Sequence, residues 1–336
     1  MKIGYLRNRK SPSKLSRLLA MSCKSRGIDV IYMTPWGVNK ETGTVDGKAF
    51  INNEWVSIRT SLPPFIDISP YCFKKMDKRV IDYLKEKTIL SYNRENLINS
   101  EKLHLKIKAD TELNAFALPS SRMQKFEDIL KETHKYKCVI LRPVNYSGKR
   151  VYIINKNDDL YNLTYGEEKK YLSIESLKEF YDAKLKGNNY IVQKSLESRT
   201  ITGECFSCRI HVEKDIKGKW NVARNYVMVR IGDQESFKIS KNKGIADINQ
   251  FLRANFGEQW KEINKDLNFL AHTLPYKYEK WRKTRLLTLG IDVGIDDKGK
   301  CYVLHVNTAP NPTPLLAQVA ILRMQYYEYI LQNKKM

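Results

Sequence analysis

The residues with the clearest chemical potential lie near the C-terminus, in residues 290–307. Two strand-forming runs flank an Asp-Asp-Lys-Gly turn there, which predicts a β-hairpin. Asp292 lies in the middle of one arm, while His305 and Asn307, two residues apart, share one face of the other arm. A carboxylate and an amide that meet across a hairpin can ligate a hard cation, which in turn can hold the phosphates of a nucleotide.

A second group of possible ligands is less favourable. Cys205, Cys208 and His211 are spaced three residues apart, which superficially suggests zinc. Residues three apart on a strand point to opposite faces, however, and no second cysteine pair accompanies them. We therefore disfavour a zinc site here.

The N-terminal segment must form a small α/β lobe. A strand at 2–6, a helix begun by Ser11 and Pro12, and a strand at 28–33 make a β-α-β unit. Alternating runs between 44 and 58 are interrupted by Asp-Gly and Asn-Asn, two dipeptides typical of hairpin turns. A further buried strand is expected at 65–68.

The rest of the chain mixes helices with antiparallel strands, an α+β organisation. Helices are expected at 95–108, from Ser120 or Ser121 to 134, at 173–187, 246–255, 258–289 and 311–331. Strands are expected at 139–141, 151–154, 190–193, 209–213 and 219–229, the last two as a hairpin, and in the arms of the final hairpin.

Composition limits the classes of protein that remain. The chain has 336 residues, 42% of them apolar and 29% charged, which fits a soluble protein of two or three lobes. It has no apolar run near the roughly 20 residues that a membrane helix needs, and no secretory signal is visible. Six cysteines suit a reducing compartment, so we expect a cytoplasmic protein with no membrane partner.

The charge balance is strongly basic. Fifty-nine Lys and Arg against 37 Asp and Glu give a net charge of +22. This favours an acidic polymer or nucleic acid as a partner, with basic clusters at 7–10, 74–79 and 277–285. The alternative is that lysine simply covers solvated helix faces.

Several segments together resemble a known family, the YheC/YheD-type endospore coat-associated proteins of the ATP-grasp superfamily. The resemblance runs over essentially the whole chain. Besides the opening lobe, the segments that carry it are Leu118-Pro119, 140–143, 191–196, 206–209 and, most specifically, 290–307. It implies an N-terminal α/β lobe (1–92) followed by an ATP-grasp fold of two α+β subdomains (93–190 and 191–336), with ATP between them.

The resemblance also implies which residues bind ATP. Lys102 and Arg142 match two basic positions that meet the phosphates, and Ser147 and Gly148 lie in the loop that covers them. Gln193, Lys194 and Leu196 match the hinge along the adenine, and Glu197 is a candidate for the ribose hydroxyls.

Catalytic and metal roles follow in the same way. Arg209 matches a cation that faces the transferring phosphoryl group, and Arg142 would share that role; the alternative is that both arginines are plain ion-pair formers. Asp292, His305 and Asn307 match the metal-ligand positions, for Mg²⁺ or Mn²⁺.

This sequence departs from the family pattern at the triphosphate end. Position 305 is normally a glutamate, a lysine is usual in place of Arg142, and the loop at 145–150 retains one glycine where several are usual. Ser207 and Thr288 replace acidic residues. His305 is then a buried structural histidine, a proton carrier, or a nitrogen ligand that shifts preference towards Mn²⁺ or Zn²⁺.

Two functions follow from the resemblance, and the basic charge alone leaves a third, a direct nucleic-acid-binding function or tRNA as a substrate. The first is an ATP-dependent carboxylate–amine ligase that acts through an acyl phosphate, with an unidentified carboxylate and amine as substrates. The second is a degenerate ATP-grasp protein of the spore-coat type that binds a nucleotide or a polyanion without turnover.

Overall fold

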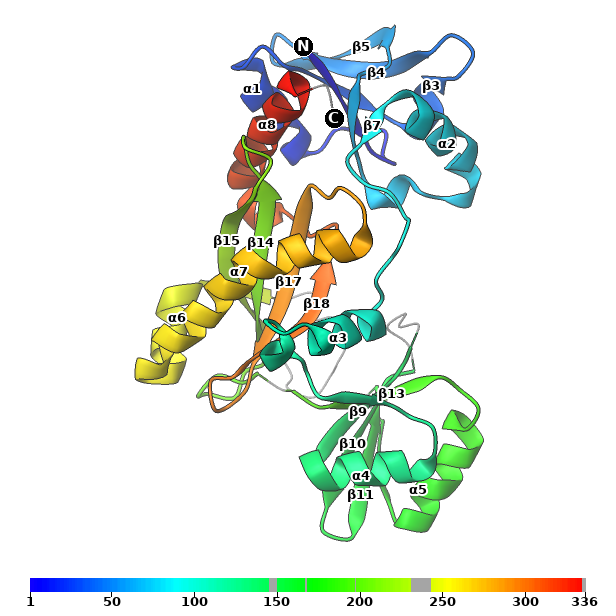
Figure 1. Cartoon of the computed structure of the whole chain (residues 1–336), viewed down its shortest axis with the longest axis vertical. Coiled ribbons are helices and arrows are strands. Elements are labelled where there is room, and N and C mark those ends of the chain that lie inside the picture. Colours follow the sequence, from blue (N-terminus) through cyan, green and yellow to red (C-terminus); the bar gives the residue numbers. More distant parts are fainter. Residues whose placement is uncertain (145–149, 167, 197, 231–242, 334–336) are drawn as a thin grey trace.

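The computed structural model describes residues 1–336 apart from 145–149, 167, 197, 231–242 and 334–336. Three β-sheets with their helices follow one another along the long axis of the molecule (Figure 1). The helices are α1 (Lys14–Lys24), α2 (Lys78–Lys87), α3 (Ser100–Ala109), α4 (Phe126–Tyr136), α5 (Ile174–Phe180), α6 (Ile248–Phe256), α7 (Trp260–Arg282) and α8 (Leu316–Gln332).

The first sheet forms the N-terminal lobe, with strand order β3-β4-β2-β1-β6-β7 and β5 paired to β4. Its strands are β1 (Lys2–Leu6), β2 (Asp29–Met33), β3 (Val38–Asn39), β4 (Thr44–Ile51), β5 (Glu54–Ser61), β6 (Phe65–Ile68) and β7 (Ile89–Leu90). Strand β1 runs parallel to β2 on one side and to β6 on the other. The chain thus leaves β1 in one direction and returns on its other side, which makes the carboxyl ends of β1 and β6 a topological switch point.

The second sheet is antiparallel, in the order β12-β11-β10-β9-β13-β8. Its strands are β8 (Ser120–Arg122), β9 (Cys138–Pro143), β10 (Tyr152–Asn157), β11 (Leu160–Tyr165), β12 (Glu168–Leu172) and β13 (Tyr190–Lys194). Leu141, Tyr152 and Val192 are cross-strand neighbours on the face that packs against α4 and α5. Because side chains alternate along a strand, Arg142 and Gln193 lie on the opposite face.

The third sheet has the order β16-β15-β14-β17-β18. Its strands are β14 (Phe206–Lys214), β15 (Trp220–Arg230), β16 (Lys243–Asp247), β17 (Thr288–Ile295) and β18 (Cys301–Asn307). Ile210 and Val212 on β14 belong to the apolar core that α6 and α7 cover. The other face of β14 carries Arg209, His211 and Glu213.

Helix α8 ties the two ends of the chain together. Leu15 and Leu19 of α1 share a core with Val319 and Tyr327 of α8. The same helix also contacts β14 and β15 of the third sheet. The C-terminal helix therefore lies between the N-terminal lobe and the third sheet (Figure 1).

Most expected strands are confirmed, including β1, β6, the hairpin of β14 and β15, and the final hairpin of β17 and β18. The helix expected to begin at Ser120 or Ser121 is wrong at its start. Those residues form β8, which pairs with β13, and α4 begins at Phe126. The helix expected over 258–289 ends at Arg282, where Lys283 takes a left-handed conformation with φ of +47°.

Three further differences concern the strands and helix α3. Asp46-Gly47 is not a turn but lies inside β4, and β11 and β12 were not expected. The helix expected from residue 95 begins at Ser100. The proposed subdomain boundary at 190/191 falls inside β13, which pairs with β9 in the second sheet, so this strand belongs with the first of the two subdomains. Within the described residues, no helix is long and apolar enough to cross a membrane.

Candidate functional site

Three polar residues form a row across adjacent strands of the third sheet. Arg209 on β14 lies directly opposite Asp292 on β17, and Asp292 lies directly opposite His305 on β18. Asn307 is opposite Gly290, one pair further along, so His305 and Asn307 share a face as the sequence predicted. The row lies on the face of the sheet turned away from α6 and α7.

Arg209 and Asp292 form a close bidentate ion pair. Arg209 Nε donates to Asp292 Oδ1 at 2.5 Å and Nη2 donates to Oδ2 at 3.0 Å, and both side chains are largely buried. Gly290 makes room for this guanidinium. A Cβ at Gly290 would lie 2.9 Å from Arg209 Nη1 and 2.8 Å from the Cβ of Pro310.

The donor set around Asp292 fits Mg²⁺ poorly. Asp292 is the one carboxylate in the row and it is held by Arg209, while Asn307 Oδ1 accepts a hydrogen bond from the amide of Ala309 at 2.8 Å. His305 offers nitrogen, whereas Mg²⁺ prefers oxygen ligands. Across the described residues, no group of three or more His, Cys, Asp or Glu is arranged to hold a metal. Metal binding by Asp292, His305 and Asn307 stays a prediction.

The second sheet brings a cation towards this row. Arg142, on the face of β9 opposite the helices, is close enough for its charge to lower the pKa of both His104 and His305. Helix α3, which carries His104, packs against β18. Arg142 therefore faces the row of Arg209, Asp292 and His305 across the space between the two sheets.

His104 is a site residue that the sequence reasoning missed. It is 4% exposed, and the Gln193 amide donates to its Nε2 at 3.3 Å, while Nδ1 has no hydrogen-bond partner among the described residues. Burial, with the charges of Arg142 and His305, lowers the pKa of His104 to about 4. The imidazole is therefore neutral at pH 7. A single histidine within an amphipathic helix carries no local signal for this role.

His305 differs from His104 because its side chain is exposed. Surrounding protein atoms still lower its pKa, and Arg209 and Arg142 add to this effect, while Asp292 opposes it. The reading of His305 as a buried structural histidine is thus wrong. An accessible, largely neutral imidazole next to two arginines can accept a hydrogen bond or meet an anion after protonation.

The expected adenine hinge follows β13. Lys194 donates its amide to Pro119 at 2.9 Å and its ammonium lies 3.8 Å from Asp296. Leu196 packs on Gly294, where a Cβ would come within 2.7 Å of the leucine side chain. The hinge thus lies directly against the third sheet, and Gln193 turns its side chain inwards to His104 rather than along the hinge.

The structure does not bring the remaining predicted cofactor residues into contact with the row of Arg209, Asp292 and His305 within its described part. Lys102 is exposed on α3, one half-turn from the buried His104. Ser147, Gly148 and Glu197 lie outside the described residues. Three cationic side chains, Arg142, Arg209 and Lys194, come together here, and Arg209 and Lys194 pair with Asp292 and Asp296. Such a group of cations suits a polyphosphate.

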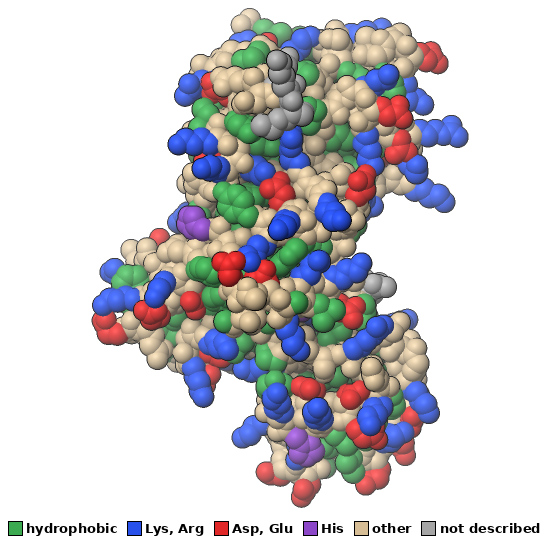
Figure 2. Space-filling model, viewed as in Figure 1, with side chains coloured by type: hydrophobic (Ala, Val, Ile, Leu, Met, Phe, Trp, Pro, Cys, Tyr) green, Lys and Arg blue, Asp and Glu red, His purple; other side chains and the backbone are tan. Residues whose placement is uncertain are grey.

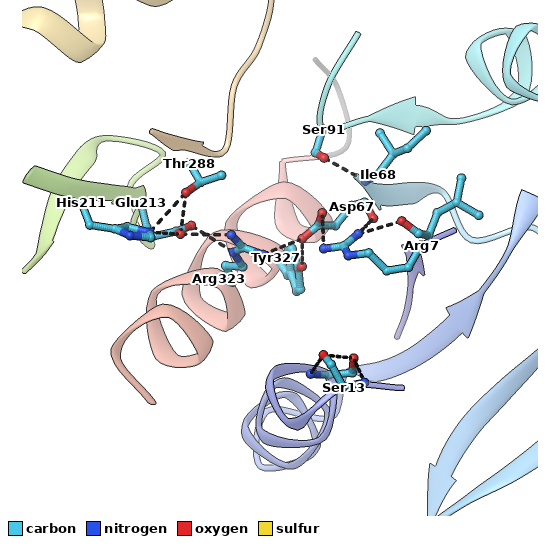
Figure 3. A network of polar contacts seen from close by, with 12 residues as sticks. Arg7, Ser13, Asp67, Ile68, Ser91, His211, Glu213, Thr288, Arg323 and Tyr327 are labelled. Atoms are coloured by element: carbon cyan, nitrogen blue, oxygen red, sulfur yellow. Dashed lines mark hydrogen bonds and ion pairs between the residues drawn. The ribbon is translucent and has the colours of Figure 1, made fainter. Parts of the chain in front are cut away.

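A buried polar network joins β14 of the third sheet to the N-terminal lobe through α8 (Figure 3). Arg323 of α8 donates to Glu213 at 3.0 and 3.1 Å, and its Nη1 lies 3.6 Å from Asp67 of β6. Asp67 also accepts from Arg7 and from Tyr327. Burial alone would raise the pKa of Asp67, but Arg7 and Arg323 hold it below its usual value.

This network forms one wall of a cavity of about 320 Å³ between the lobe and the third sheet. Arg7 and Asp67, at the ends of β1 and β6, line it together with Thr288, Pro310 and Arg323. Because Pro310 also borders Gly290 and Arg209, the cavity adjoins the row of charged residues.

The fold matches solved ATP-grasp structures. D-alanyl-alanine synthetase A from Vibrio cholerae aligns with a TM-score of 0.52 at 14% identity, over 98% of this chain and 96% of that one. The C-terminal domain of K. lactis Pby1, described as an ATP-grasp enzyme, aligns with a TM-score of 0.54 at 13% identity, over 95% and 90%. At these identities the likeness establishes the ATP-grasp fold.

The sequence comparisons define the family. The YheC/D-like ATP-grasp family matches residues 89–333, and the chain belongs to this family. Endospore coat-associated protein YheC of Bacillus subtilis is 20% identical over 330 residues, or 94% of this chain and 90% of YheC. Endospore coat-associated protein YheD of the same organism is 21% identical over 285 residues, which are 81% of this chain but 62% of the length of YheD.

Proposed function

We propose that the chain binds ATP between the second and third sheets and uses it to join a carboxylate to an amine. The observation that carries the proposal is the row of Arg209, Asp292 and His305 with Arg142 facing it from the other sheet. Two guanidinium groups on strands are rigidly placed and remain charged at any physiological pH. Membership of an ATP-grasp family supports the nucleotide as ligand.

In the proposed reaction, a carboxylate oxygen attacks the γ-phosphorus of ATP, and the bond to the leaving ADP breaks. The resulting acyl phosphate is then attacked at carbon by the amine, which loses a proton as phosphate leaves. Arg142 and Arg209 would stabilise the negative charge on the phosphoryl oxygens during the first step. Asp292 holds the Arg209 guanidinium in a fixed orientation for that purpose.

The cavity of about 320 Å³ is the proposed place for the acceptor substrate. It lies at the switch point of the first sheet, where open α/β sheets commonly bind ligands. Its volume is at the small end of the range for ligand cavities, which favours a compact substrate. Its lining contains cationic and anionic side chains, Arg7, Arg323 and Asp67. These could bind the carboxylate and the amine groups of one small molecule.

Hydroxylamine trapping tests this reaction without knowledge of the natural amine. The protein is incubated with ATP, hydroxylamine and a panel of amino acids and short peptides, and hydroxamate and ADP are measured together. We expect stoichiometric hydroxamate and ADP with at least one carboxylate, and loss of both in Arg209→Ala. The exposed Lys131→Ala on α4 is the matched control.

A second candidate function is nucleotide binding without turnover. It is favoured by one observation, that the single carboxylate of the row is engaged by Arg209 and not free for a metal. In that case calorimetry detects ATP binding, while hydroxamate and ADP stay absent with every carboxylate and with Mg²⁺ or Mn²⁺.

The location of the protein is also a proposal. The coat-associated names of YheC and YheD support a role in the cytoplasm of a spore-forming cell or at the spore itself. Fractionation of sporulating cells, with an antibody against this chain, would distinguish the two.

A further inference from the structure

A second cavity lies in the subdomain of the second sheet, on the face opposite Arg142. It has a volume of about 620 Å³, within the range of small-molecule sites. The residues that line it are Arg150, which precedes β10, and members of β10, β11, β12, the end of α5 and the helical segment Tyr181–Leu185 that follows α5 (Figure 1). We call it the tyrosine cavity.

Aromatic rings form the floor of the tyrosine cavity. Tyr152 and Tyr165 stack with ring centroids 5.0 Å apart and an interplanar angle of 30°, and Phe180 meets Tyr152 edge-on at 5.1 Å. Tyr152 is buried, but Tyr165 is 45% exposed. One face of the Tyr165 ring is covered by Tyr152, so the exposed area leaves its other face open to a planar ligand.

Three cations stand at the rim of the same cavity. Arg150, Lys170 and Lys184 are exposed residues of its lining, and Glu168 is the acidic residue among them. Within the described part of the chain, none of the three cations forms a salt bridge. Lys170 is opposite Leu163 and Glu168 is opposite Tyr165 in the strand register, so both lie on the aromatic face.

The position of the cavity separates it from the proposed ATP site. Tyr152 pairs with Leu141, whose neighbour Arg142 points to the other face of the sheet. A ligand in the tyrosine cavity would therefore be divided from the nucleotide between the sheets by the thickness of the second sheet.

We propose that the tyrosine cavity binds a nucleoside phosphate, with the base stacked on Tyr165 and the phosphate held by Arg150, Lys170 and Lys184. Aromatic faces next to lysine and arginine are the combination that binds single-stranded nucleic acid with little sequence preference. The nucleoside phosphate has two sources, a single strand, which the net charge of +22 would attract, and a free nucleotide. The experiment separates these two sources.

The test measures fluorescence anisotropy of a labelled single-stranded uridine oligonucleotide, with unlabelled UMP and the unlabelled oligonucleotide as competitors. The native protein should bind the oligonucleotide, with affinity that falls steeply as salt rises if the strand is the source. Competition by UMP at a similar concentration identifies the free nucleotide as the source.

Variants assign the binding to the cavity. Tyr165→Ala should weaken binding by about 5-fold to 100-fold, the loss of one stacked base, whereas Tyr165→Phe should bind as the native protein does. Lys170→Gln with Lys184→Gln should weaken it more than Lys108→Gln with Lys131→Gln, which removes the same charge from exposed positions on α3 and α4. Circular dichroism melting shows that each variant is folded.

Two results would overturn the proposal. One is that neither the oligonucleotide nor UMP binds at low salt. The other is that the cavity variants bind normally while Arg142→Ala does not, which would place the ligand between the sheets.

Discussion

Charges at the level of single residues define what the space between the sheets can bind. Arg209 pairs with Asp292 and Lys194 at the hinge pairs with Asp296, while Arg142 brings a third cation from the second sheet. The pKa of His104 is lowered by burial and by Arg142, and the pKa of the exposed His305 is lowered by the surrounding protein atoms and by both arginines. A bound polyphosphate would place negative charge next to these arginines.

The first prediction at this scale concerns Arg142. Arg142→Ala should lower ATP affinity about tenfold or more, since a hydrogen bond to a charged group contributes about 1.5–3 kcal/mol. Lys131→Ala, an exposed cation on the helix-covered side of the same subdomain, should leave the affinity unchanged. Calorimetric titration measures the ATP affinity of both variants. Equal losses of affinity would show that Arg142 does not contact ATP.

The second prediction concerns His305. His305→Glu adds a carboxylate beside Asp292, so Mg²⁺ should strengthen ATP binding in this variant by at least about fivefold more than in the native protein. His305→Gln supplies oxygen without charge and should show a smaller gain. Titrations of ATP with and without Mg²⁺ decide this. A native protein that already needs Mg²⁺, and loses that dependence in His305→Glu, would show that the histidine is part of a working metal site.

At the scale of elements, sequence reasoning succeeded where the signal is local. The final hairpin has its own turn residues, and its register places Asp292 beside His305. Arg209 meets Asp292 through pairing between strands 83 residues apart, which no local pattern specifies. Likewise Ser120 and Ser121 have the composition of a helix cap, but pairing with β13 draws them into a strand.

Contacts between distant segments also decide the role of a glycine that the sequence assigns to a turn. Asp46-Gly47 has the sequence of a turn, yet Gly47 serves a close approach, because a Cβ there would lie 2.8 Å from the carbonyl oxygen of Tyr32. His104 was missed because nothing near it in the sequence distinguishes it from a core histidine. The Gln193 amide that donates to His104 and the Arg142 charge that lowers its pKa come from two strands, β13 and β9, that are distant from α3 in the sequence.

Gly290 gives the prediction at this scale. Gly290→Ala should destabilise the protein by about 1–3 kcal/mol and weaken ATP binding, because the added methyl group displaces Arg209 or Pro310. Gly27→Ala is the control, since Gly27 has φ of +65° and open space around it. It should cost stability but leave ATP affinity intact. Denaturant unfolding and calorimetry are compared for both, and undiminished ATP binding by Gly290→Ala would contradict the placement of Arg209.

At the scale of the whole molecule, the basic charge is dispersed. Lys and Arg are interspersed with Asp and Glu over the face seen in Figure 2. Two members of the expected basic clusters, Arg7 and Arg282, are not surface charges, because Arg7 is paired with Asp67 and Arg282 is buried against backbone carbonyls. The predicted clusters therefore do not form a uniform polyanion surface.

The buried network gives the whole-molecule prediction. Arg323→Met leaves Asp67 and Glu213 without their shared cation and should cost about 3–5 kcal/mol, whereas Lys14→Met on the surface should cost little. Both carboxyls have a pKa below the usual value, so the stability they contribute is present above about pH 4 and is lost as pH falls further. The difference between native and variant should therefore shrink at pH 3. Unfolding curves at pH 7 and pH 3 measure it, and a constant difference would contradict the ionised network.

The most direct measurement is a structure determined with a non-hydrolysable ATP analogue and Mg²⁺ or Mn²⁺. We expect the triphosphate between Arg142 and Arg209 and the adenine against the hinge at Leu196. The same structure shows how many metal ions bind next to Asp292. A nucleotide found only in the tyrosine cavity, or no nucleotide at saturating concentration, would contradict the account.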